Sequence, residues 1–123
     1  MDIRGTQKYK KTAGRNFMVL KIEIMVVFST APPGKSESLA RMLVDKRLAA
    51  CVNVVPVNSY YRWKGEFCSE PEHLLIAKTT KDKVDKVIAA IKALHPNEVP
   101  EIIALPVSSG HLPYLEWVHQ ETS

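Results

Sequence analysis

The first hydrophobic pattern along the chain predicts a strand followed by a helix. Residues 21–29 alternate between polar and hydrophobic side chains at first and then become continuously hydrophobic, which is typical of a strand whose second half is buried on both faces. Pro32 and Pro33 end this strand, and Ser36 is placed to cap a helix that ends near residue 48. Helical spacing gives that helix one hydrophobic side, formed by Leu39, Met42 and Leu43.

The middle of the chain predicts a β-hairpin. A valine-rich stretch over 50–57 indicates a strand that resumes over 59–63. Pro56 has no backbone N–H to donate to a neighbouring strand, so we expect a sheet edge or a bulge at this position. Residues 64–66, Lys-Gly-Glu, are typical of a hairpin turn, and the partner strand is predicted over 72–79.

The second half of the chain predicts a helix, a strand and a short terminal helix. Thr80 or Asp82 is expected to cap the first of these helices, and Pro96 ends it. Its hydrophobic stripe is the clearest periodic pattern in the chain and consists of Val84, Val87, Ile88, Ile91 and Leu94. Residues 101–107 predict a strand, and Pro113 suits the first position of the terminal helix.

The order of elements is therefore β-α-β-β-α-β plus a C-terminal helix. This order predicts an α+β fold of the ferredoxin-like, split βαβ type, in which an antiparallel sheet carries both main helices on one face. A chain of 123 residues is long enough for one domain, which we place at residues 19–123. Residues 1–18 have no hydrophobic periodicity and are expected to be a disordered basic extension: a tag, a leader, or a start upstream of the true one at Met18.

All of the charge imbalance lies in that extension. The chain has a net charge of +4, and residues 1–16 alone hold five basic residues and one acidic residue. The remaining residues hold 12 of each sign, a balance that argues against nucleic acid as a partner. No hydrophobic run approaches the roughly 20 residues of a membrane helix, so no membrane partner is expected. Two cysteines are too few for a disulfide framework, and we expect a cytoplasmic protein.

The segment 95–101 holds the densest group of candidate ligands. His95, Glu98 and Glu101 bring one imidazole and two carboxylates within seven residues, and these groups suit divalent metals. The alternative is a helix end followed by a loop with solvated charges.

Two residues of the predicted strands have their own alternatives. Cys51 is either a small buried hydrophobic residue or a soft ligand for copper or another thiophilic metal. Lys78 would need Glu98 or Glu101 as a partner if it lay on the helix-covered face, and would be solvated on the other face.

The predicted hairpin carries three aromatic residues, Tyr60, Tyr61 and Trp63. An RNA-stacking surface is one interpretation, but the partner strand over 72–79 has no aromatic residue to complete it. Packing at a protein interface is therefore the favoured interpretation.

The sequence does not favour catalysis. Residues 29–36 resemble a phosphate-binding loop, but Ser29 occupies the position of the first required glycine, and two prolines remove backbone donors. No nucleophile and base are paired by the sequence pattern, so we expect no enzymatic activity.

Five segments together resemble the CutA family of divalent-cation tolerance proteins. In order along the chain they are RLAACVN at 47–53, YRWKGE at 61–66, KT at 78–79, HPNEVPEI at 95–102 and YLEW at 114–117. The resemblance covers about residues 22–120. It implies a ferredoxin-like subunit of a non-enzymatic homotrimer, in which neighbouring subunits extend one another's sheets.

The resemblance also implies a role in tolerance to divalent cations, with copper as the cation proposed for bacterial members. Those members place a cysteine and a histidine pair where this chain has Ser29, Leu94 and His95, so His95 is the one shared ligand. No cofactor is required, and Cu²⁺ or another divalent metal is the expected bound ion. The residues assigned to metal are His95, Glu98 and Cys51, those assigned to a further ligand are Lys78 and Glu101, and those assigned to the trimer interface are Tyr61, Trp63 and Trp117.

Two other functions stay open. One is a small-ligand sensing trimer like the PII signalling proteins, with a small anion held between subunits near Lys78 and the 95–101 segment. The short connection over 64–71 argues against the long mobile loop of those proteins. The other is a structural anchoring protein.

Overall fold

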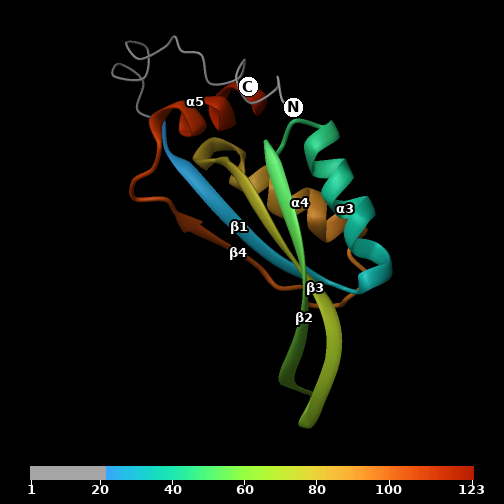
Figure 1. Ribbon diagram of the computed structural model, residues 1–123. Helices are drawn as coiled ribbons and strands as arrows, with labels where there is room; N and C mark the ends of the chain where they lie inside the picture. The colour runs from blue at the N-terminus through green and yellow to red at the C-terminus, as the bar shows by residue number, and fades with distance from the viewer. Residues whose placement is uncertain (1–21) are drawn as a thin grey trace.

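Four antiparallel strands form one sheet in the order β2-β3-β1-β4 in the computed structural model, which describes residues 22–123 (Figure 1). The elements in chain order are β1 (Ile24–Ala31), α3 (Pro33–Asp45), β2 (Cys51–Trp63), β3 (Glu66–Thr80), the 3₁₀ turn η1 (Lys81–Lys83), α4 (Val84–Leu94), β4 (Ile102–Pro106) and α5 (Leu112–Glu121). This order and sheet confirm the ferredoxin-like prediction. The extension predicted over 1–18 lies outside the described residues.

The main core lies between the sheet and helices α3 and α4. Residues from these elements and from the loop after α3 form one buried cluster, which consists of Val27, Leu43, Ala49, Ala77, Val87 and Ile91. The cluster uses alternate strand positions and one side of each helix, as the sequence pattern predicts. Leu94, expected in the buried stripe of α4, is instead 45% exposed because it is the last residue of that helix.

Both helix starts differ from the predicted caps. Helix α3 begins at Pro33, three residues before the expected cap Ser36, because proline is preorganised for the first helical turn and needs no N–H partner there. Ser36 is buried within the helix, where its hydroxyl lies 2.6 Å from His73 Nδ1. Thr80 lies immediately before the 3₁₀ turn that leads into α4, and its hydroxyl donates to Asp82 Oδ1 at 2.6 Å, which lowers the pKa of Asp82.

Strands β2 and β3 form one long, unbroken hairpin. Every residue from Cys51 to Trp63 pairs with a partner on β3, so the interruption expected between the two parts of β2 is absent. Pro56 lies on the edge strand, as expected, and causes no bulge. Lys64 and Gly65 both have positive φ angles, the geometry of a two-residue type I′ turn. The hairpin therefore projects beyond the layer of helices (Figure 1).

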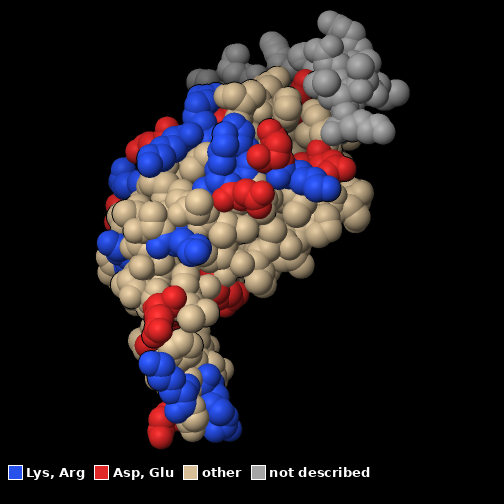
Figure 2. Space-filling model, turned by 180° about the vertical axis from the view of Figure 1, so that it is seen from behind, with Lys and Arg blue, Asp and Glu red and all other residues tan. Residues whose placement is uncertain are grey.

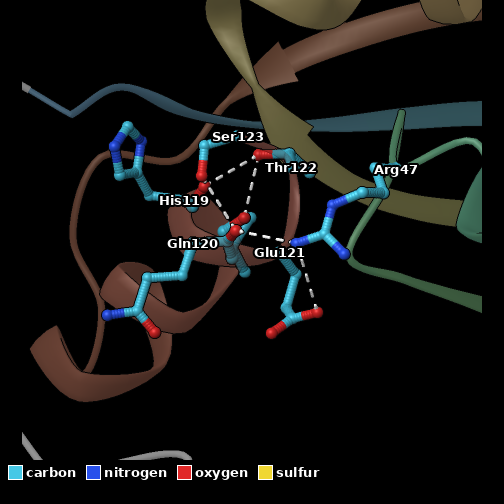
Figure 3. A network of polar contacts seen from close by, with 7 residues as sticks. Arg47, His119, Gln120, Glu121, Thr122 and Ser123 are labelled. Atoms are coloured by element: carbon cyan, nitrogen blue, oxygen red, sulfur yellow. Dashed lines mark hydrogen bonds and ion pairs between the residues drawn. The ribbon is translucent and has the colours of Figure 1, made fainter.

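Arg47 joins the end of α3 to the C-terminal helix. It adopts φ 58° just after the helix. Its backbone N–H donates to the Val44 carbonyl, and the N–H of Leu48 donates to the Leu43 carbonyl. These two bonds define a Schellman motif at the end of α3. Its guanidinium donates to the Gln120 carbonyl at 3.3 Å and lies 3.9 Å from the Glu121 carboxylate (Figure 3). An arginine at this position thus helps to hold α5 in place.

The sheet face opposite α3 and α4, which we call the open sheet face, is hydrophobic and only half covered. The strand register places on it Val26 and Phe28 of β1, Leu74 and Ile76 of β3, and Ile103 and Leu105 of β4. Ile103 is 50% exposed and Leu105 is 44% exposed. Both edge strands, β2 and β4, also lack a partner on their outer side among the described residues.

Ser29 offers a test of the core. Its hydroxyl is buried and has no hydrogen-bond partner among the described residues, and such a group destabilises a fold. We expect Ser29→Ala to raise the free energy of unfolding by about 1 kcal/mol in a urea titration. Ser36→Ala is the control and should lower it, because that hydroxyl is bonded to His73. A less stable Ser29→Ala protein would contradict this account.

Candidate functional site

A cleft of about 730 Å³ lies between the projecting hairpin and the loop that precedes β4. We call it the hairpin cleft. Its residues come from the end of β1, from β2 and β3 of the hairpin, and from the loop over 97–101; they are Thr30, Ser59, Tyr60, Tyr61, Trp63, Glu70, Glu72, Asn97, Glu98, Val99 and Glu101. The described part of the chain thus forms a cleft whose lining is rich in carboxylates and aromatic rings.

Glu70 holds Tyr61 within the cleft. The Tyr61 hydroxyl donates a hydrogen bond to Glu70 Oε2. This bond, with smaller contributions from desolvation and neighbouring charges, raises the pKa of Tyr61 to about 12. The raised pKa keeps the phenol protonated, and thus a hydrogen-bond donor, to a more alkaline pH than an ordinary tyrosine.

Two further carboxylates reach the cleft from the 97–101 loop. Glu101 Oε1 accepts from the Thr30 hydroxyl at 3.5 Å, and Glu98 lies 3.7 Å from Lys64 Nζ. The same Lys64 ammonium lies 5.6 Å from the centre of the Trp63 ring. Glu98 and Lys64 are both largely exposed, so this ion pair contributes little to stability.

Glu72 is the unusual member of the lining. It is 7% exposed, and it has no hydrogen-bond or ion-pair partner among the residues that the structure describes. Its carboxylate oxygens still reach the solvent in the cleft, because Ser29 Oγ is the one fully buried side-chain oxygen or nitrogen without a partner among the described residues. No motif in the sequence marks this residue as part of a site, although a glutamate that begins a hydrophobic strand segment is a signal that could identify it.

His95 is buried and uses both ring nitrogens within the chain. Nε2 lies 2.7 Å from the Thr30 carbonyl oxygen, and the backbone N–H of Asn97 donates to Nδ1 at 3.1 Å. These contacts require a neutral ring with its proton on Nε2. His95 therefore ties the loop after α4 to the end of β1, and a metal would have to displace the Asn97 contact to reach Nδ1.

Cys51 and Lys78 lie elsewhere on the sheet. Both are on the open sheet face, where Lys78 Nζ donates to Asn53 Oδ1 and lies 4.0 Å from Cys51 Sγ. Lys78 pairs with Val26 on β1, whereas His95 contacts Thr30, four residues farther along that strand. At the usual strand rise this separation is about 13 Å.

The structure therefore separates several predicted site residues. Within residues 22–123, no three His, Cys, Asp or Glu side chains are grouped closely enough to hold a metal, so His95, Glu98 and Cys51 do not meet in one chain. Glu101 lines the hairpin cleft without Lys78. The three expected interface residues lie in two different places. Tyr61 and Trp63 line the cleft, whereas Trp117 packs against Tyr114 on α5 with ring centres 5.5 Å apart.

Ser36 and His73 form a serine–histidine contact that no sequence spacing indicated. Their 2.6 Å separation resembles that of a nucleophile and its base. Ser36 is only 3% exposed, however, and its hydroxyl also contacts the Pro33 carbonyl at 3.2 Å. The contact therefore joins α3 to β3 and offers no access to a substrate.

Comparison with known proteins places this geometry in a family. The model of the CutA1 divalent ion tolerance protein family matches residues 24–121. The divalent-cation tolerance protein CutA of Thermus thermophilus is 46% identical over 99 residues, which cover 79% of this chain and 96% of that protein. Human protein CutA is 44% identical over 101 residues, covering 80% of this chain and 56% of the human protein, so the chain spans little more than half of that relative.

Solved structures agree. CutA1 from Thermus thermophilus superposes with a TM-score of 0.78 at 45% identity, covering 81% of this chain and 99% of that chain. A structure titled as the PII-like protein CutA from Nostoc, in apo form, has a TM-score of 0.78 at 37% identity, covering 80% and 97%. Within the described part of the chain, no helix is both long and hydrophobic enough to cross a membrane.

The Tyr61–Glu70 bond can be tested by titration. At about pH 11 most ordinary tyrosines are ionised, whereas Tyr61, with its pKa at about 12, should remain largely protonated. Glu70→Gln removes the carboxylate, so its tyrosinate absorbance at that pH should exceed that of the wild type by about one tyrosine. Glu66→Gln removes a charge from the same strand outside the cleft and should match the wild type. Equal absorbance in all three proteins would refute the bond.

Proposed function

The chain belongs to the CutA1 divalent ion tolerance family, and from this premise we propose that it is a non-enzymatic homotrimer that acts in tolerance to divalent cations, copper among them. The observation that supports the trimer best is the open sheet face. It exposes Ile103 and Leu105 beside other hydrophobic residues, and a half-covered hydrophobic face of this kind is typical of a protein interface.

The sheet edges support the same assembly. Among residues 22–123, strands β2 and β4 have no strand on their outer sides, and proteins commonly cover such edges by pairing them with another chain. The projecting hairpin, with Tyr61 and Trp63 near its end, is long enough to reach a neighbouring subunit (Figure 1). We assign Trp117 on α5 to the same contact.

We propose that metal binding is weak, because one chain offers few ligands at any single place. His95, Glu98 and Cys51 remain the residues assigned to it. His95 must give up its contact with Asn97 to bind a metal through Nδ1, and this exchange lowers the affinity.

The hairpin cleft favours a second candidate function, the sensing of a small ligand. A volume of about 730 Å³ falls within the range of small-molecule sites, and one similar solved structure carries the description PII-like. This function needs no catalytic residue, and it is compatible with a trimer.

We further propose a cytoplasmic location and no nucleic-acid partner. Both cysteines are free, which suits a reducing compartment. Lys and Arg side chains alternate with Asp and Glu over the face seen in Figure 2, and both signs occur on the hairpin. Such mixing lacks the continuous basic surface that nucleic acid requires.

The trimer can be tested by sedimentation. We expect the wild type to sediment at three times the 13.8 kDa mass of one chain. Ile103→Lys places a charge on the open sheet face and should shift the protein toward the monomer. Val44→Lys alters a similarly exposed residue on α3 and should leave the trimer intact. A wild type that sediments as a monomer at all concentrations would exclude the assembly.

Metal binding can be tested by titration calorimetry with Cu²⁺. We expect His95→Ala to lose most of the heat that the wild type releases, because imidazole is a preferred Cu²⁺ ligand and His95 is the one histidine of the proposed set. His111→Ala, which removes an exposed histidine at the start of α5, should resemble the wild type. Equal heats for the wild type and His95→Ala would exclude His95 as a ligand.

A further inference from the structure

The lining of the hairpin cleft has a strong excess of negative charge. Among the described residues that line it, four are glutamates, Glu70, Glu72, Glu98 and Glu101, and none is a lysine or an arginine. The exposed ammonium of Lys64 pairs with one of them, Glu98. An anion would meet repulsion from this lining, whereas a cation would be attracted.

From this lining we propose that the hairpin cleft binds a small organic cation, an amine or a guanidinium compound, with Glu72 as its main charge partner and the hairpin aromatics as its walls. The inference rests on the second candidate function, ligand sensing, and names its ligand class. It reverses the sign expected from the sequence, which placed a small anion near Lys78 and Glu101. Lys78 bonds Asn53 on the open sheet face and is absent from the lining.

Glu72 is the residue that points to a missing ligand. The other three glutamates have partners within the chain: Tyr61 for Glu70, Lys64 for Glu98 and Thr30 for Glu101. Glu72 as a whole residue is 7% exposed, and its carboxylate has no partner among the described residues and faces the cleft. A bound ammonium or guanidinium would supply both the charge and the hydrogen-bond donors that this carboxylate lacks.

The same lining favours an organic cation over a metal ion. Among the described residues no three ligating side chains are close enough to coordinate a metal, so the four glutamates are spread around the cleft. Tyr60, Tyr61 and Trp63 add aromatic surface, which attracts organic cations through their ring faces.

Lys64 already displays this mode of recognition at the rim. Its ammonium lies 5.6 Å from the centre of the Trp63 ring and 3.7 Å from Glu98 Oε1, so one amine contacts an aromatic ring and a carboxylate together. A ligand amine deeper in the cleft would find the same combination in Glu72 and the Tyr61 ring. Tyr61 is held for this role by its bond to Glu70.

Three compounds that share a five-carbon chain test the sign of the ligand: 1,5-diaminopentane is cationic, 1,5-pentanediol is neutral and glutarate is anionic. We expect calorimetric binding to the full chain for the diamine alone. Glu72→Gln keeps the shape of the side chain and removes its charge, so it should weaken diamine binding by at least about tenfold. Glu66→Gln removes a charge from the hairpin outside the cleft and should bind as the wild type does.

Several results would overturn the proposal. They are binding of glutarate in preference to the diamine, equal affinity of Glu72→Gln and the wild type, and no diamine binding at all. If the wild type does not bind the diamine and Glu72→Gln sediments as a smaller assembly, then Glu72 pairs with a basic side chain of a second copy of the chain. Loss of Cu²⁺ heat in Glu72→Gln, with the diamine inert, would assign the cleft to a metal. The tests of the trimer and of the His95 metal site use other variants and other probes. Failure of diamine binding would therefore be distinguished from failure of the proposed trimer or of the proposed metal site.

Discussion

The unbroken pairing of β2 with β3 is the constraint on which the rest of this structure depends. Thirteen residues of β2, including Pro56, keep one register with β3 from Cys51 to the turn. Since helices α3 and α4 cover only the body of the sheet, no helix of the described residues lies behind the far half of the hairpin (Figure 1). Its aromatic and acidic side chains are thereby left free to form one wall of a cleft, and its length makes it available to a neighbouring chain.

The opposite wall depends on His95. Its ring links the Thr30 carbonyl to the Asn97 backbone N–H, so the loop that leaves α4 is fastened to the end of β1. That attachment places Glu98 and Glu101 opposite Glu70 and Glu72. A histidine that the sequence marks as a metal ligand thus has a structural task in the single chain, and the site that it shapes is acidic.

The two faces of the sheet have different roles. The face under α3 and α4 holds the buried cluster around Val27 and Ala77. Among the described residues, the Ser29 hydroxyl is the one buried side-chain group there without a hydrogen-bond partner. The open sheet face carries hydrophobic residues that a single chain leaves half exposed, such as Ile103. Hydrophobic surface of this extent, on a sheet whose two edges are unpaired among the described residues, supports the proposed interface between copies of the chain.

The sequence by itself determined the order of elements, the ferredoxin-like fold and the family, because hydrophobic periodicity, the Lys64–Gly65 turn and the motif around His95 are local patterns that neighbouring residues suffice to define. It misjudged the start of α3, since the cap preference of Ser36 yielded to the geometry of Pro33. Only the tertiary structure decided which side chains come together: Ser36 contacts His73, Lys78 contacts Asn53, and Glu72 lines one cleft with residues of the 97–101 loop. Those meetings depend on strand register and on where loops cross the sheet, and both are set by contacts between residues far apart in the chain, on which a local pattern carries no information.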